Sequence, residues 1–140
     1  MKKIWVGFLI VFAFVVCGLV FRMFLSPQST HATVELHDEL ANVTEIHIVD
    51  SSGSTPVAPV KIKGNDAKEL IRLLEVNEKP GAFTQNYTEY SLKFFNGKTL
   101  VADAELTESN SLVIHRNKTY RDMVLLPNSA KRLRSYLEAH

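Results

Sequence analysis

Two histidines are the residues best placed to do chemistry in this 140-residue chain. His47 and His115 fall in predicted strands, and both lie on the outward face of their strand. A hydrolytic site needs a nucleophile within hydrogen-bond reach of a base, which a third group usually orients. The two histidines could meet across the sheet, with Glu45 or Asp50 beside His47. We expect them instead to be two separate, partly exposed strand residues.

A second group of metal-ligating residue types lies in the polar segment 26–42. Its members are His31, Glu35, His37, Asp38 and Glu39. Their spacing matches no closed ligand set, and a flexible stem would not hold a coordination geometry. The chain also lacks the GxSxG, HExxH, CxxC, Walker and GxGxxG patterns. We therefore expect no enzyme, and we assign no catalytic, cofactor-binding or metal residues; binding residues stay unassigned.

Charge does not indicate a nucleic-acid partner. Beyond the first 26 residues the chain has 13 basic and 15 acidic residues, and no basic stripe is visible. Lys131, Arg132 and Arg134 form the one basic cluster there. On a C-terminal helix they are expected to complement the helix dipole and to face solvent rather than to bind a phosphate.

The first 25 residues predict a membrane anchor. Ile4 to Phe21 is a run of eighteen residues without a charge, which as a helix is about 27 Å long, close to the thickness of a bilayer core. Lys2 and Lys3 precede it, and acidic residues follow it. The positive-inside rule then keeps the N-terminus in the cytoplasm and places residues 26–140 outside. Cys17 continues the apolar run and is expected to pack in lipid.

A cleaved signal peptide is the alternative to an anchor. Thr30-His31-Ala32 offers a poor small-x-small site, and cleavage after Ala32 would release a secreted domain. The apolar run is long for a signal peptide, so we favour a single-pass protein with its C-terminal domain outside the cell membrane.

Residues 43–140 predict one α+β domain, preceded by an anchor at 1–25 and a juxtamembrane stem at 26–42. Alternation and turn residues give the order β-β-α-β-β-β-β-α, an antiparallel sheet with two helices on one face. The predicted strands are 44–50, 57–63, a hairpin over 87–106, 111–115 and 118–124; the helices are 66–76 and 128–138. Inward positions include Ile46, Ile48, Val60, Ile62, Leu92, Phe94, Leu112, Ile114, Ala130, Leu133 and Leu137.

Three local features carry finer predictions. Asp66 caps the first helix, with Glu69 completing a capping box. In the first hairpin a three-residue loop, 95–97, pairs Phe94 with Lys98 and Leu92 with Leu100. Val34, Leu36 and Leu40 are candidates to pack a short helical turn of the stem onto the domain.

Residues 77–88 are the longest irregular stretch and the first candidate for a binding loop. Phe83 and Tyr87 are the aromatic residues that it could present. We expect both of them to tuck under the sheet.

The layout resembles that of small exported domains of Gram-positive bacteria that follow an N-terminal anchor or lipoprotein signal. The shared features are an Ile-x-Ile first strand (Ile46 to Ile48), a capped helix at 66–76, an antiparallel hairpin and a C-terminal helix. The resemblance covers about 43–138 and is one of pattern. It implies an extracytoplasmic location and a role in binding or envelope upkeep, and it transfers no functional residues.

Two function classes remain from the sequence. The favoured one is a membrane-anchored, non-enzymatic binding or regulatory domain with a protein partner in the envelope. The alternative is a small envelope hydrolase or metal-dependent enzyme that uses His47 or His115, which requires one of them to lie in a pocket against a carboxylate.

Overall fold

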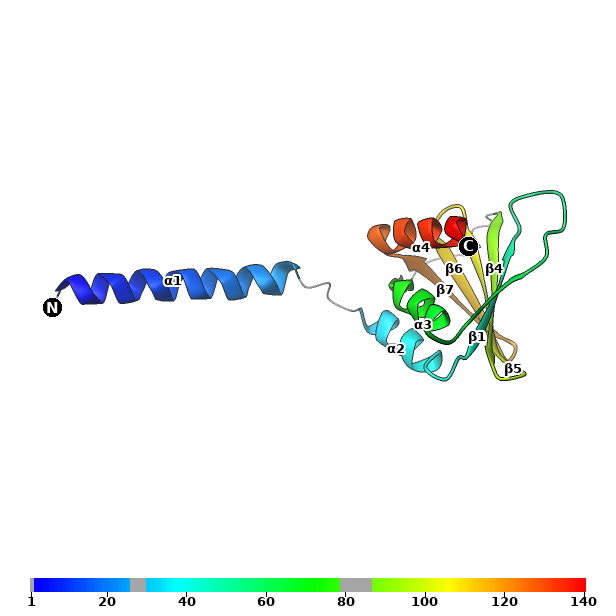
Figure 1. The fold of residues 1–140 in the computed structure, drawn as a ribbon, viewed down its shortest axis with the longest axis horizontal. Coiled ribbons are helices and arrows are strands. Elements are labelled where there is room, and N and C mark those ends of the chain that lie inside the picture. Colours follow the sequence, from blue (N-terminus) through cyan, green and yellow to red (C-terminus); the bar gives the residue numbers. More distant parts are fainter. Residues whose placement is uncertain (1, 26–29, 79–86) are drawn as a thin grey trace.

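The computed structural model describes residues 2–25, 30–78 and 87–140 (Figure 1). Its helices are α1 (Lys2–Leu25), α2 (His31–Glu39), α3 (Gly64–Leu73) and α4 (Pro127–Ala139). Its strands are β1 (Glu45–Asp50), β2 (Val60–Lys63), β3 (Val76–Glu78), β4 (Thr88–Asn96), β5 (Thr99–Thr107), β6 (Ser111–Arg116) and β7 (Thr119–Leu125).

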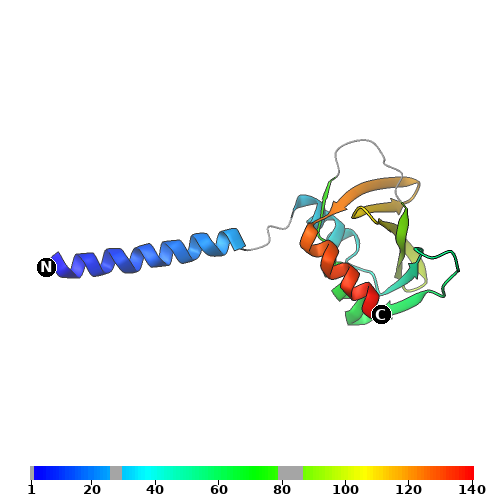
Figure 2. The ribbon, with the colours of Figure 1, turned by 90° about the horizontal axis from the view of Figure 1, so that it is seen from above.

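The strands form one seven-stranded antiparallel sheet in the order β2-β1-β4-β5-β6-β7-β3. Helices α2, α3 and α4 cover one of its faces, as Figures 1 and 2 show. The α+β class is confirmed. The predicted element order is incomplete, because it lacks two elements, the helix α2 and the short strand β3.

Alternate strand residues and the apolar stripes of three helices make the core. The predicted inward residues Ile46, Ile48, Ile62, Leu92, Phe94, Leu112, Ile114, Ala130, Leu133 and Leu137 are all buried. Val60 pairs with buried Ile48, so it lies on the predicted inward face, but it is 38% exposed. It begins β2, which is an edge strand paired only with β1.

The polar segment before β1 is part of the folded unit rather than a separate stem. Thr30 caps α2, and its side chain accepts a hydrogen bond from the Thr33 N–H. Leu36 and Leu40 are fully buried, in line with the helical turn expected there, whereas Val34 is 47% exposed. The core therefore begins well before residue 43, the predicted start of the domain.

The helix α1 contributes no residue to this core among those whose side chains are described. In the part of the chain that the structure describes, no helix is found that is long and apolar enough to cross a membrane. The transmembrane helix predicted for residues 1–25 therefore stays a prediction.

The helix α3 starts and stops earlier than predicted. Its N-cap is Lys63, without a side-chain hydrogen bond, so the capping box of Asp66 and Glu69 is not formed. Asp66 lies in the first turn instead, where a carboxylate is favoured by the helix dipole. Leu73 ends the helix, because Val76 enters the sheet as β3.

The β4–β5 register differs from the predicted three-residue loop. Asn96 pairs with Thr99 across a two-residue turn, and a bulge follows, so that Phe94 pairs with Ala102 and Leu92 with Ala104. Gly97 has φ +60°, as the first central residue of a type II′ turn requires. The bulge, rather than the loop length, brings the apolar sides of the two strands to the same face.

The β6–β7 turn offers a test of backbone strain. Its central residues Asn117 and Lys118 both have positive φ, +47° and +70°, the pattern of a type I′ turn. Lys118→Gly should raise the free energy of unfolding by about 0.5–1 kcal/mol, because glycine adopts this conformation without strain. Urea unfolding measures the change.

Lys98→Gly is the matched control, because Lys98 also lies in a two-residue turn but is not among the positive-φ residues. There the substitution should lower stability by a few tenths to about 1 kcal/mol. Stabilisation by both substitutions, or by neither, would contradict the assignment of strain to Lys118.

Candidate functional site

No described helix covers the sheet face opposite α2, α3 and α4 (Figures 1 and 2). A cross-strand row on this face contains Asp103 of β5, His115 of β6 and Tyr120 of β7. The next row contains Glu105 and Val113. We call this side of the sheet the outer face. It presents side chains without a covering helix, so it is the natural place to look for a ligand site.

Two adjoining hollows lie on the outer face. One, of about 370 Å³, lies between the first half of β5 and the β6–β7 hairpin. The other, of about 430 Å³, is lined by Glu105, Val113, His115 and Tyr120. His115 and Tyr120 line both. Their ring centroids are 6.4 Å apart, and Tyr120 is 62% exposed. An exposed aromatic ring beside an apolar floor and a nearby carboxylate is suited to binding.

His47 occupies a different part of the outer face. Its Nε2 lies 2.5 Å from Glu45 Oε1, and its ring packs on Phe95 with centroids 4.5 Å apart. Lys63 Nζ is 3.4 Å from the other Glu45 oxygen. The hydrogen bond from His47, aided by Lys63, lowers the pKa of the Glu45 carboxyl below its ordinary value of 4.5.

His47→Ala should raise the Glu45 pKa toward 4.5, because the main group that favours the carboxylate is removed. The Glu45 contribution to stability is present above the unfolded pKa and is lost as pH falls through the lowered folded pKa. In the variant the two pKa values lie closer together, so this contribution should shrink and the stability should fall less as the solution is acidified. Carboxyl NMR titration measures the shift, and His115→Ala should leave it unchanged. An unmoved Glu45 titration in His47→Ala would refute the pairing.

The structure does not bring His47 and His115 together. They lie on β1 and β6, and β4 and β5 separate those strands in the sheet. Three strand spacings place the two rings about 14 Å apart. Neither histidine can pass a proton to the other at that separation.

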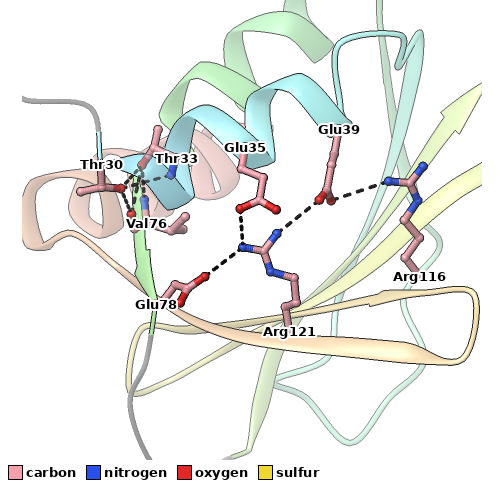
Figure 3. A network of polar contacts seen from close by, with 8 residues as sticks. All are labelled: Thr30, Thr33, Glu35, Glu39, Val76, Glu78, Arg116 and Arg121. Atoms are coloured by element: carbon pink, nitrogen blue, oxygen red, sulfur yellow. Dashed lines mark hydrogen bonds and ion pairs between the residues drawn. The ribbon is translucent and has the colours of Figure 1, made fainter.

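Three of the metal-ligating residue types of segment 26–42, His37, Glu35 and Glu39, make other contacts. His37 Nε2 lies 3.0 Å from the Leu74 carbonyl. Figure 3 shows Arg121 of β7 between three carboxylates, with Glu35 and Glu39 at 3.2 Å and Glu78 at 3.3 Å. In the described residues no group of three or more histidine, cysteine or acidic side chains is arranged to hold a metal ion. The carboxylates of α2 instead join the helix to the sheet.

The basic cluster of α4 is divided among separate contacts. Arg134 donates to Glu89 at 2.9 Å and also to Asn110 and the Thr107 carbonyl, which joins α4 to the sheet. Arg132 pairs with Glu75 at 3.4 Å. These guanidinium groups are already engaged, so the cluster does not form a phosphate site.

The candidate binding loop 77–88 is described only at its ends. Val76–Glu78 forms β3, while Phe83 lies outside the described residues. Tyr87 is 84% exposed, so the expectation that it tucks under the sheet is wrong.

The sequence placed His115 on the outward face of its strand, but it did not join His115 and Tyr120 into one site. Their pairing follows from the two-residue turn at Asn117 and Lys118, which sets His115 opposite Tyr120. The positive-φ preference of asparagine was the one available signal. In comparisons with known proteins, no family model, curated protein or solved structure matches this chain.

Proposed function

We propose that the protein is a membrane-tethered, extracytoplasmic, non-enzymatic binding domain whose ligand site is the pair of hollows at His115 and Tyr120. The main support for this ligand site is that Tyr120 is 62% exposed and lines both hollows, on a sheet face that no described helix covers. Open faces with an aromatic residue and a few polar groups are typical of binding surfaces.

The tether is supported by the sequence and by the side chains of α1. Eighteen residues without a charge follow two lysines, which favours an N-terminus in the cytoplasm. Large apolar side chains point outward on all sides of this helix: Leu9, Ile10, Val11, Phe12, Phe14, Val15, Val16 and Leu19 are 40–76% exposed. A helix that is apolar all round needs an apolar environment.

The entry point of the tether supports the choice of the outer face. The chain enters the domain at Thr30 and passes directly into α2, which belongs to the helical layer. The proposal therefore puts the helical layer on the membrane side of the domain, with the outer face of the sheet turned away from the membrane. A ligand in the envelope can reach His115 and Tyr120 without meeting the bilayer.

Retention of the tether is favoured over cleavage after Ala32. Cleavage there would cut the first turn of α2 and remove Thr30, the helix cap. It would also remove Ala32, which is 5% exposed in the core. Losing a cap alone costs about 1 kcal/mol, so the released domain would be less stable than the tethered one.

The alternative of an envelope hydrolase or metal-dependent enzyme is not proposed. His47 is engaged with Glu45, and His115 lies against Tyr120 on β6, which two strands separate from β1. The contacts of the two histidines among the described residues are with Glu45, Phe95 and Tyr120, and none of these is a serine, threonine or cysteine nucleophile.

The proposal is tested by site-specific cross-linking in whole cells. A photo-reactive phenylalanine analogue in place of Tyr120 should give a discrete adduct in the membrane fraction. The same analogue in place of Lys131, exposed in the helical layer, should not give that adduct. Identical adducts from both positions, or none from position 120, would refute the site, and recovery of the chain in the soluble cytoplasmic fraction would refute the tether.

A further inference from the structure

A second groove lies in the helical layer, between the C-terminal half of α2 and the helix α3. It has a volume of about 200 Å³. Its floor is apolar and is made by Leu40, Val43 and Ile71, all of which are buried. Its rim carries Lys68 and Arg72 of α3, together with His37.

The charge of this groove is one-sided. Lys68 and Arg72 stand one helical turn apart, so their side chains project from the same face of α3. No carboxylate is among the lining residues. Among the described residues, the side chains of Lys68 and Arg72 make no hydrogen bond or ion pair, whereas Arg121, Arg132 and Arg134 are each paired with a carboxylate. Two free cations above an apolar floor favour an anion that has an apolar part.

The groove lies close to the end of α1, which favours a membrane lipid as the source of that anion. Leu25, the last residue of α1, and Thr30 are five residues apart, a reach of at most about 17 Å. His37 is six residues along α2 from His31, about 9 Å further. The groove is therefore within about 26 Å of the end of α1 and lies in the layer where the tether enters.

Val34 extends the apolar surface toward the membrane. It lies one helical turn before His37 on the same side of α2 and is 47% exposed. Val34 thus adds one exposed apolar side chain between the groove and the start of α2.

We propose that this groove binds the anionic headgroup of a phospholipid in the membrane that holds α1, an inference that rests on the proposed tether. Arg72 and Lys68 contact the phosphate, since a guanidinium group suits bidentate phosphate recognition. Leu40 and Ile71 accept the apolar part of the lipid. Binding holds the helical layer against the bilayer and keeps the outer face of the sheet turned toward the ligand.

The test uses the full chain in micelles of an uncharged detergent. Short-chain phosphatidylglycerol is titrated while amide and side-chain NMR signals of Lys68, Arg72 and His37 are followed. Saturable shifts should appear with phosphatidylglycerol and not with phosphatidylcholine. The double variant Lys68→Gln/Arg72→Gln should bind about ten- to thirty-fold more weakly, as expected for two lost cationic contacts.

The matched control is Lys61→Gln/Lys93→Gln, which removes the same charge from exposed positions on the sheet. Its affinity should equal that of the unmodified chain. Unchanged affinity in the groove variant, equal binding of phosphatidylcholine, or equally tight binding of inorganic phosphate would overturn the proposal. Failure of the tether is seen separately, as loss of the unmodified chain from the membrane fraction.

Discussion

Replacing Leu36 by alanine is expected to lower the free energy of unfolding by about 2–5 kcal/mol. Leu36 lies on α2 and has no exposed surface. Its side chain belongs to the single core that also contains residues of the sheet, α3 and α4. Truncation leaves a cavity that rigid neighbours fill only in part. Chemical denaturation of the full chain, followed by the signal of the folded domain, measures the change.

Val34→Ala is the matched control, because Val34 lies on the same helix but is 47% exposed. Its effect should stay within about 0.5 kcal/mol, as for most surface substitutions. If the two substitutions had equal effects, α2 would be an appendage and the domain would begin near residue 43. A large difference means that a fragment starting at residue 43 lacks part of its own core.

The sequence was informative where one periodicity dominated. Ile46 and Ile48 alternate with polar residues, and this pattern correctly predicted both the strand and its buried side. The apolar spacing of Leu133 and Leu137 likewise predicted the last helix. In both cases the local pattern and the tertiary contacts agree, so a short window of sequence was enough.

It failed where a long-range contact decides the structure. The segment that forms α2 is mostly polar, so the sequence predicted only a short helical turn at Leu36 and Leu40 within a stem, and not a helix from His31 to Glu39 with Ala32 in the core. The strand β3 has three residues, too few to show a period of two. The hollows at His115 and Tyr120 depend on how β5 and the β6–β7 hairpin diverge, which no spacing within one strand encodes.

The helix α2 and its cap also provide hydrogen-bond partners for the edge strand β3. The Leu126 N–H donates to the Glu75 carbonyl at 2.9 Å, so Val76 and Leu125 form a non-hydrogen-bonded pair. The Val76 N–H and carbonyl therefore point away from β7, as unpaired groups of an edge strand do. The side chains of Thr30 and Thr33 reach both groups (Figure 3).

Thr33→Val should therefore destabilise the protein by about 1–3 kcal/mol, although it changes the side-chain volume little. Thr33 Oγ1 accepts from the Val76 N–H at 2.9 Å and donates to the Val76 carbonyl at 3.0 Å. The residue is 2% exposed, so water cannot easily replace these bonds. Hydrogen exchange at the Val76 amide should become faster. The free energy of opening calculated from it should fall by at least the same amount.

Thr44→Val is the control for losing a threonine hydroxyl, because Thr44 bonds the Gly97 N–H at an exposed turn where water can substitute. This substitution should lower the free energy of unfolding by less than about 1 kcal/mol, and hydrogen exchange at the Val76 amide should not change. If the two variants lost the same free energy of unfolding, the edge of β3 would be open to water despite the contacts of Thr30 and Thr33. A specific loss at Thr33 would show that α2 closes the edge of the sheet at β3 and also contributes to the core.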